Sequence, residues 1–258
     1  MNKTAQYIKS NKDSLSVYFT AEYPTKGSTK EVILALQESG ANLIEVGIPF
    51  SDPLADGPVI QKSSKQALEN GFTLEQLFSD LEDIKSEVKI PLVLMGYFNT
   101  LLAYGVENFL KKCKSLNIDS VIFPDLPAVV YEKNYQKLFK KYGVSLVFLI
   151  TPQTSNERIE MINNLSDAFI YIVADNSITG KKGELSTAQM DYFKRMKAYD
   201  FKVPLMIGFG ISDYQSFKNA CEYANGVIIG SAFIQSIANS NHIKQSVHDF
   251  VTSIKWGK

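Results

Sequence analysis

Short apolar runs recur along the chain, and polar segments with a helical pattern separate them. Each run is rich in β-branched or aromatic residues and is almost continuously hydrophobic, which is typical of parallel strands covered on both faces. The pattern therefore predicts strands at residues 16–20, 42–46, 91–95, 119–123, 144–150, 168–173, 203–207 and 226–230.

The spacing of these strands predicts the architecture. Most begin roughly 25 residues apart, which leaves room for a strand, a loop and a crossover helix. Alternation of this kind over 258 residues indicates a (β/α)8 TIM barrel of the α/β class, and we expect residues 1–258 to form one domain with an N-terminal helix. Two intervals are longer, because 47–90 holds an extra helix after the second strand and 174–185 holds a polar loop. Loops after the strands form the active face of such barrels, so these insertions suggest lids or partner contacts.

Charge and composition narrow the possible functions. Lys+Arg and Asp+Glu both number 27, so the formal net charge is zero. A neutral chain lacks the electrostatic footprint of nucleic-acid or anionic-membrane binding. The N-terminus is polar and the longest apolar runs are too short to span a bilayer, which predicts a soluble cytoplasmic protein. Cys113 and Cys221 lack CxxC spacing, so we expect free buried thiols and no metal site.

A glutamate interrupts the second apolar run, LIEVG. Glu45 shares one face of this strand with Leu43, and we place it at the strand end. If that face is the barrel interior, desolvation raises the pKa of Glu45 and allows it to donate a proton near neutral pH. The alternative is a rim glutamate paired with a lysine.

The loop after this strand carries two more carboxylates, Asp52 and Asp56, between prolines. Asp56 precedes Gly57 and Pro58, so it also fits a plain helix start with proline at the first helical position. The other interpretation is that the loop brings Asp56 back toward Glu45. Two carboxylates in unlike environments can hold opposite protonation states, and a solvated Asp56 would be ionised.

Glycines end the last two strands and indicate an anion site. Gly208, Gly210 and Gly230 allow tight turns, while Ser212 and Ser231 can cap the helices that follow. Exposed N–H groups at such turns favour phosphate, and loops after strands seven and eight hold phosphate in many barrels. The alternative is that these glycines only serve the turns. In the polar loop, Lys181 and Lys182 are expected to be solvated.

The composite of motifs resembles the tryptophan synthase alpha subunit family. The stretch LIEVGIPFSDPLADGPVIQ is similar to that family's signature, and LMGYFN, VIFPDLP, GFGIS and GSAF follow in its order and spacing over nearly the whole chain. The resemblance implies a lyase that cleaves indole-3-glycerol phosphate to indole and glyceraldehyde 3-phosphate in tryptophan biosynthesis. It also implies a β subunit that holds pyridoxal phosphate in an α2β2 heterotetramer, and no cofactor or metal in this chain.

The same resemblance implies roles for individual residues. Glu45 is expected to protonate indole C3, and Asp56 to accept a hydrogen bond from the indole N–H. Asp52 and Pro53 are expected to contact the β subunit. The histidines, His242 and His248, lie in the C-terminal helix, away from the strand ends. The implied substrate and phosphate pocket consists of Tyr18, Ile60, Ile122, Tyr171, Thr179, Gly180, Phe209, Gly210, Ile228, Gly230 and Ser231.

Two segments depart from the family pattern. The stretch ADNSITG at 174–180 lacks an arginine and a glycine that many members have, although Thr179 and Gly180 are retained. In AEYP at 21–24, Glu22 stands where glycine is commoner. Two other functions stay open: another phosphate-binding barrel isomerase or epimerase, and a non-catalytic activator of a β subunit.

Overall fold

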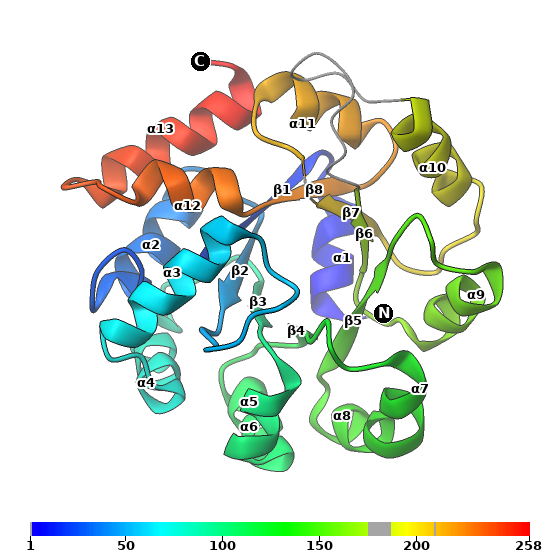
Figure 1. The fold of residues 1–258 in the computed structure, drawn as a ribbon, viewed down its shortest axis with the longest axis horizontal. Coiled ribbons are helices and arrows are strands. Elements are labelled where there is room, and N and C mark those ends of the chain that lie inside the picture. Colours follow the sequence, from blue (N-terminus) through cyan, green and yellow to red (C-terminus); the bar gives the residue numbers. More distant parts are fainter. Residues whose placement is uncertain (1, 175–186, 209) are drawn as a thin grey trace.

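The computed structural model describes residues 2–174, 187–208 and 210–258. Parallel strands close into a barrel in sequence order, with helices around it (Figure 1), so the predicted barrel is confirmed. Each strand begins within two residues of its predicted start. The strands are β1 (Ser14–Thr20), β2 (Leu43–Gly47), β3 (Leu92–Met95), β4 (Ser120–Ile122), β5 (Ser145–Ile150), β6 (Ile170–Val173), β7 (Leu205–Gly208) and β8 (Gly226–Ile229).

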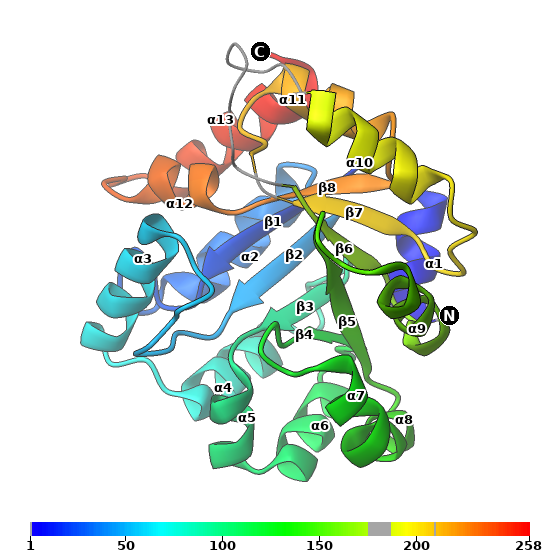
Figure 2. The same cartoon turned by 45° about the vertical axis from the view of Figure 1, so that its right-hand side comes forward.

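Amphipathic helices cover the outside of the barrel (Figure 2). Their apolar faces pack on the outward side chains of the strands and form the larger core. They are α1 (Lys3–Ser10), α2 (Ser28–Glu38), α3 (Pro58–Glu69), α4 (Leu74–Ile84), α5 (Phe98–Tyr104), α6 (Val106–Ser115), α7 (Ala128–Val130), the π-helix η1 (Tyr131–Tyr135), α8 (Gln136–Tyr142), α9 (Asn156–Leu165), α10 (Thr187–Lys197), α11 (Tyr214–Cys221), α12 (Ser231–Ile237) and α13 (Ile243–Trp256).

The extra elements lie where the sequence predicts them. Helix α1 is the N-terminal helix, and α3 and α4 both fall between β2 and β3. Asp119 accepts hydrogen bonds from the backbone N–H groups of Lys3 and Thr4, and Ile8 packs into the barrel's inner cluster. Helix α1 therefore closes the N-terminal end of the barrel and leaves the opposite end for the loops.

Strand pleating decides which side chains enter the barrel. Leu43 belongs to the inner cluster, whereas Ile44 and Val46 belong to the outer core, so Glu45 points inward. The placement of Glu45 at the strand end is wrong, because β2 continues to Gly47 and pairs Glu45 with Tyr18 on β1. Glu45 consequently lies deeper in the barrel, with no exposed surface.

Two glycines make room for two tyrosines inside the barrel. A Cβ on Gly47 would lie 2.3 Å from the Tyr18 hydroxyl oxygen, and one on Gly208 would lie 2.1 Å from that of Tyr171. Both distances are far below van der Waals contact, so only glycine lets these rings lie flat against the neighbouring strands. The phenols are thereby fixed at the inner wall, close to Glu45.

We expect Gly47→Ala to lower the free energy of unfolding by about 2 kcal/mol, because the added methyl overlaps a rigid Tyr18 ring. Urea denaturation followed by circular dichroism would measure this. The control is Gly57→Ala, where a Cβ meets no atom within 4 Å. It should cost less than about 1 kcal/mol. Equal losses in the two variants would contradict the close packing of Tyr18.

Candidate active site

A pocket of about 300 Å³ opens at the C-terminal ends of the strands. Most of the predicted site residues come together there: Tyr18, Glu45, Asp56, Ile60, Tyr171, Gly210, Ile228, Gly230 and Ser231. Side chains from both halves of the barrel thus meet in one cavity. Its remaining lining residues, which were not among the site residues inferred from the resemblance, are Met95, Ile211, Ser212, Ile229, Ala232 and Gln235.

Other predicted residues lie elsewhere. Ile122 is fully buried in the inner cluster of the barrel and does not line the pocket. Asp52 is exposed and Pro53 is half-buried on the loop between β2 and α3, outside the pocket. The predictions for Thr179, Gly180 and Phe209, and for Lys181 and Lys182, fall outside the described residues.

Glu45 is a buried carboxyl group with an incomplete set of partners. The Ser16 hydroxyl donates to Oε1 over 3.1 Å, while Oε2 has no hydrogen-bond partner among the residues that the structure describes. Burial raises the pKa of Glu45 to about 8, and the bond from Ser16 opposes this only in part. The alternative of a rim glutamate paired with lysine is wrong, because the side chain lies inside the barrel. At neutral pH, Glu45 is mostly protonated and can donate a proton into the pocket.

Tyr18 and Tyr171 complete the polar part of the inner wall. Burial is the main cause that raises the pKa of each phenol, and the charges of Asp56 and Glu45 raise both further. Deprotonation is therefore unfavourable, so both hydroxyl groups stay neutral and can act as hydrogen-bond donors.

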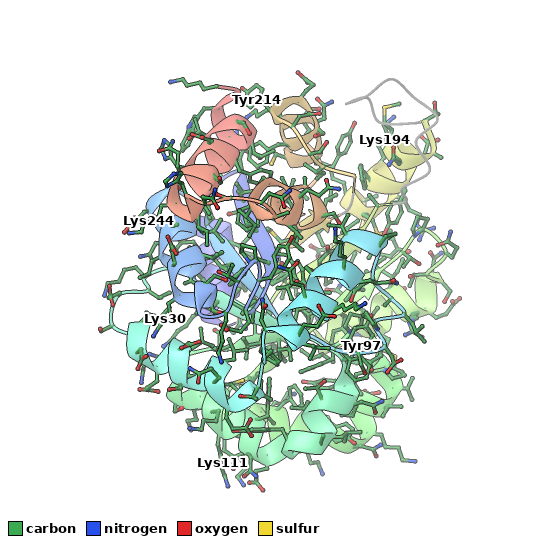
Figure 3. The ribbon with its side chains drawn as sticks, turned by 60° about the vertical axis from the view of Figure 1, so that its left-hand side comes forward. Lys30, Tyr97, Lys111, Lys194, Tyr214 and Lys244 are labelled. Atoms are coloured by element: carbon green, nitrogen blue, oxygen red, sulfur yellow. The ribbon has the colours of Figure 1, made fainter. Side chains whose placement is uncertain are left out.

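Asp56 is held by a tyrosine that the sequence reasoning missed. The Tyr97 hydroxyl donates to Oδ2 of Asp56 over 3.1 Å and accepts from the Ala55 N–H over 2.9 Å. The Tyr97 ring, labelled in Figure 3, stacks on Phe50 with centroids 5.1 Å apart. Tyr97 thus fixes the loop at three points. Its position directly after the third strand, within LMGYFN, was the available signal.

The environment of Asp56 differs from the expected one. Asp56 is half-buried, and this burial raises its pKa, while the hydrogen bond from Tyr97 acts in the opposite direction. The side chain of Asp56 is therefore less solvated than the sequence predicted, and the Tyr97 phenol donates to it. Helix α3 begins at Pro58 as predicted, but its N-cap residue is Gly57. The carboxylate of Asp56 is therefore not used as a helix cap and remains directed to the pocket.

The glycine-rich end of the pocket is built differently from the prediction in one respect. Ser212 and Ser231 are not N-cap residues: Asp213 caps α11 through a capping box with Ser216, and Gly230 precedes α12. The backbone path places Asp213 at the N-cap position of α11, which leaves Ser212 on the pocket wall. Gly210 has φ +72°, a conformation that favours glycine.

The histidines and cysteines lie apart from one another. Among the described residues, no group of three or more His, Cys, Asp or Glu side chains could hold a metal ion. His242 precedes α13 and His248 lies within it, away from the pocket. Cys113 is buried and Cys221 is half-buried, and both are free thiols. No helix in the described part of the chain is long and apolar enough to cross a membrane.

Comparisons with known proteins agree with one another. A family model described as tryptophan synthase alpha chain matches residues 4–256. The tryptophan synthase alpha chain of Flavobacterium psychrophilum is 49% identical over 254 residues, which cover 98% of this chain and 100% of that protein. The one from Christiangramia forsetii is 50% identical over 255 residues, with 99% of each covered.

Solved structures give the same result. A chain of the tryptophan synthase α2β2 complex from Pyrococcus furiosus superimposes with a TM-score of 0.88 at 35% identity, covering 96% of this chain and 99% of that chain. The tryptophan synthase subunit alpha from Legionella pneumophila superimposes with a TM-score of 0.87 at 31% identity, covering 99% and 97%.

We expect Glu45→Gln to gain stability relative to the unmodified protein as pH rises from about 4.5 to 8. A carboxyl group whose pKa is raised by folding favours the folded state below its unfolded pKa, and this contribution is lost as pH rises toward the folded value of about 8. Glutamine does not titrate, so the difference should grow by up to about 4 kcal/mol. Urea denaturation across this pH range measures it, and a constant difference would contradict the raised pKa.

Proposed function

Because the chain belongs to the tryptophan synthase alpha chain family, we propose that Glu45 and Asp56 carry out its reaction in the pocket between them. The reaction is the retro-aldol cleavage of indole-3-glycerol phosphate to indole and glyceraldehyde 3-phosphate, so the protein is a lyase of tryptophan biosynthesis. The observation that favours this assignment most is the buried, half-partnered carboxyl group of Glu45, whose raised pKa suits proton transfer near neutral pH.

Glu45 accounts for both proton transfers. Cleavage of the bond between indole C3 and the glycerol carbon needs a proton at C3 and the loss of the proton on the adjacent hydroxyl group. Protonated Glu45 donates to C3, and the resulting carboxylate accepts the hydroxyl proton as the aldehyde forms. Glu45 ends in its starting state, and no net proton is consumed.

Asp56 acts on the indole nitrogen of the substrate. Protonation at C3 places positive charge on the indole nitrogen, and a carboxylate that accepts the N–H hydrogen bond stabilises this charge. Tyr97 occupies only Oδ2 of Asp56, so Oδ1 remains available for the substrate. Tyr97 therefore orients the carboxylate without blocking it.

The remaining pocket residues divide between the two ends of the substrate. The apolar wall of Ile60 and Ile228, with the tyrosine rings, suits a flat indole. At the other side, Gly210, Gly230 and Ser231 suit the phosphate. By resemblance, Thr179 and Gly180 join the phosphate site, and Phe209 and Ile122 join the indole site.

The family places pyridoxal phosphate in the β subunit, so this chain needs no cofactor and works with a β partner in an α2β2 complex. We propose that Asp52 and Pro53 contact this partner. Their neighbour Leu54 is 92% exposed, and three more exposed apolar side chains follow the next strands, β3 and β4. These are Leu102, Val129 and Val130. Four apolar groups around one opening favour a protein interface there.

We further propose that the chain acts as one domain in the cytoplasm. Helices α1 and α13, near the two ends of the chain, pack onto the barrel and onto α2. The earlier alternatives are not supported: the family model matches the tryptophan synthase alpha chain, and a purely activating subunit would have no use for Glu45 and Asp56 in one pocket.

We expect Glu45→Gln to lower the rate of indole release by at least about a thousandfold, because glutamine can neither donate nor accept the transferred proton. Asp56→Asn should lower it by about a hundredfold through weaker charge stabilisation. In the unmodified protein, kcat/KM should fall as pH rises past about 8, where Glu45 loses its proton.

Indole release from indole-3-glycerol phosphate would be measured for the full chain, alone and with a β subunit. Circular dichroism would show that each variant is folded. A Glu45→Gln variant with a rate near that of the unmodified protein would remove Glu45 from its role. Absence of cleavage in every mixture, from folded protein that still binds the β subunit, would favour a non-catalytic partner.

We expect Leu54→Asp to weaken binding to the β subunit by at least about tenfold, because a charge replaces an apolar contact at the proposed interface. Isothermal titration calorimetry would measure the Kd. The matched control is Ser10→Asp on α1, an exposed position at the opposite end of the barrel. Equal affinities for the two variants would place the interface elsewhere.

A further inference from the structure

Asp56 is joined more firmly to the helix after it than to the strand before it. Eight residues separate Asp56 from the end of β2 at Gly47, but only one separates it from the start of α3. The Gln61 side chain donates to the Asp56 carbonyl over 2.9 Å, and the Gln61 N–H donates to the Gly57 carbonyl over 3.0 Å. The position of Asp56 therefore follows the position of α3.

The apolar contact of helix α3 with the barrel is small, because Val59 and Ile60 are only partly buried against the core. Its buried residues are only Ser63, Ser64 and Ala67. Ser63, Gln66 and Asn70 recur at the spacing of one helix face and point toward the end of β1. We call these three side chains the polar seam.

Each member of the polar seam bonds to the segment that follows β1. The hydroxyl groups of Ser63 and Thr20 are hydrogen-bonded over 2.6 Å, and either group can donate. Gln66 donates to the Pro24 carbonyl over 2.7 Å. Asn70 donates to the Glu22 carbonyl over 2.8 Å.

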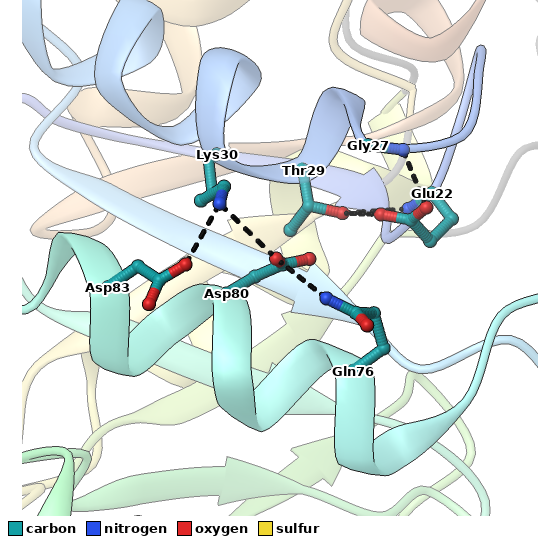
Figure 4. A network of polar contacts seen from close by, with 7 residues as sticks. All are labelled: Glu22, Gly27, Thr29, Lys30, Gln76, Asp80 and Asp83. Atoms are coloured by element: carbon teal, nitrogen blue, oxygen red, sulfur yellow. Dashed lines mark hydrogen bonds and ion pairs between the residues drawn. The ribbon is translucent and has the colours of Figure 1, made fainter.

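Glu22 makes this segment a rigid support. Its φ of +61° lies in the left-handed region that favours glycine, and the residue is only 4% exposed. Figure 4 shows its carboxylate turned toward the start of α2, where it accepts from the Thr29 hydroxyl over 2.8 Å and the Gly27 N–H over 2.6 Å. The Glu22 N–H donates back to Thr29 over 2.9 Å. These bonds offset the cost of the left-handed backbone.

We propose that the polar seam is a positioning device for Asp56, an inference that rests on the role of Asp56 proposed above. Small buried side chains alone would let α3 slide along the barrel, because apolar contacts have little directional preference. Hydrogen bonds to three successive points of the β1–α2 segment define one position. Gln66 and Asn70 thus act on the reaction through α3 and do not touch the substrate.

The test replaces the donors of the polar seam in the full chain with its β partner. The double variant Gln66→Met with Asn70→Leu keeps side-chain size and removes two bonds. We expect kcat for indole release to fall about tenfold, as a small displacement of a catalytic group does. The control Lys62→Met, an exposed change on the same helix, should leave kcat unchanged.

A double-mutant cycle with Asp56→Asn separates positioning from general loss of structure. If the polar seam acts through Asp56, the double variant should change kcat less than about twofold in the Asp56→Asn background. The same tenfold loss of kcat in both backgrounds would overturn the proposal, and so would an unchanged kcat in the background that retains Asp56. If Asp56→Asn alone keeps full activity, the proposed role of Asp56 fails instead. Should the double variant not fold, Asn70→Ala alone enters the same cycle.

Discussion

The chemistry of this barrel depends on the buried carboxyl group of Glu45, of which only one oxygen is hydrogen-bonded within the described structure. Removing a carboxylate from water is costly, and Glu45 has only the Ser16 hydroxyl to compensate for it. The protein therefore favours the protonated form, which raises the pKa to about 8. A group that would be ionised on the surface keeps its proton at neutral pH and can donate it, and the closed barrel supplies the rigid apolar walls that maintain this state.

Local geometry around Glu45 follows from strand register. Tyr18 lies opposite Glu45 on the adjacent strand, and its ring occupies the space that Gly47 leaves open. Tyr171 and Gly208 repeat the arrangement across β6 and β7. Large rings over glycines keep water out of the inner wall while they leave two neutral hydroxyl groups at the cavity. Glycine is thus required by close packing at these positions, and no turn is involved.

Much of the fold could be read from the sequence because strands in a parallel barrel are apolar on both faces and produce continuous runs. Alternation along the strand placed Glu45 on the same face as Leu43, and the structure shows that this face is the barrel interior. The partner of Asp56 did not, because Tyr97 lies 41 residues away and comes from another strand end. The caps of α11 and α12 were also misplaced, since serine and aspartate both suit an N-cap and only the backbone path decides between them. Local patterns thus predict the elements, whereas contacts between loops need the structure.

Helix α1 closes one end of the barrel, which limits where substrate can enter the pocket and where products can leave it. Ile8 fills the N-terminal opening together with the inner cluster, so the proposed site communicates with its surroundings at the loop end. Substrate and both products share that route. The exposed side chains Leu54, Leu102 and Val129 border the same end. A β subunit docked on them would lie beside this opening, which would shorten the path of indole from one protein to the other.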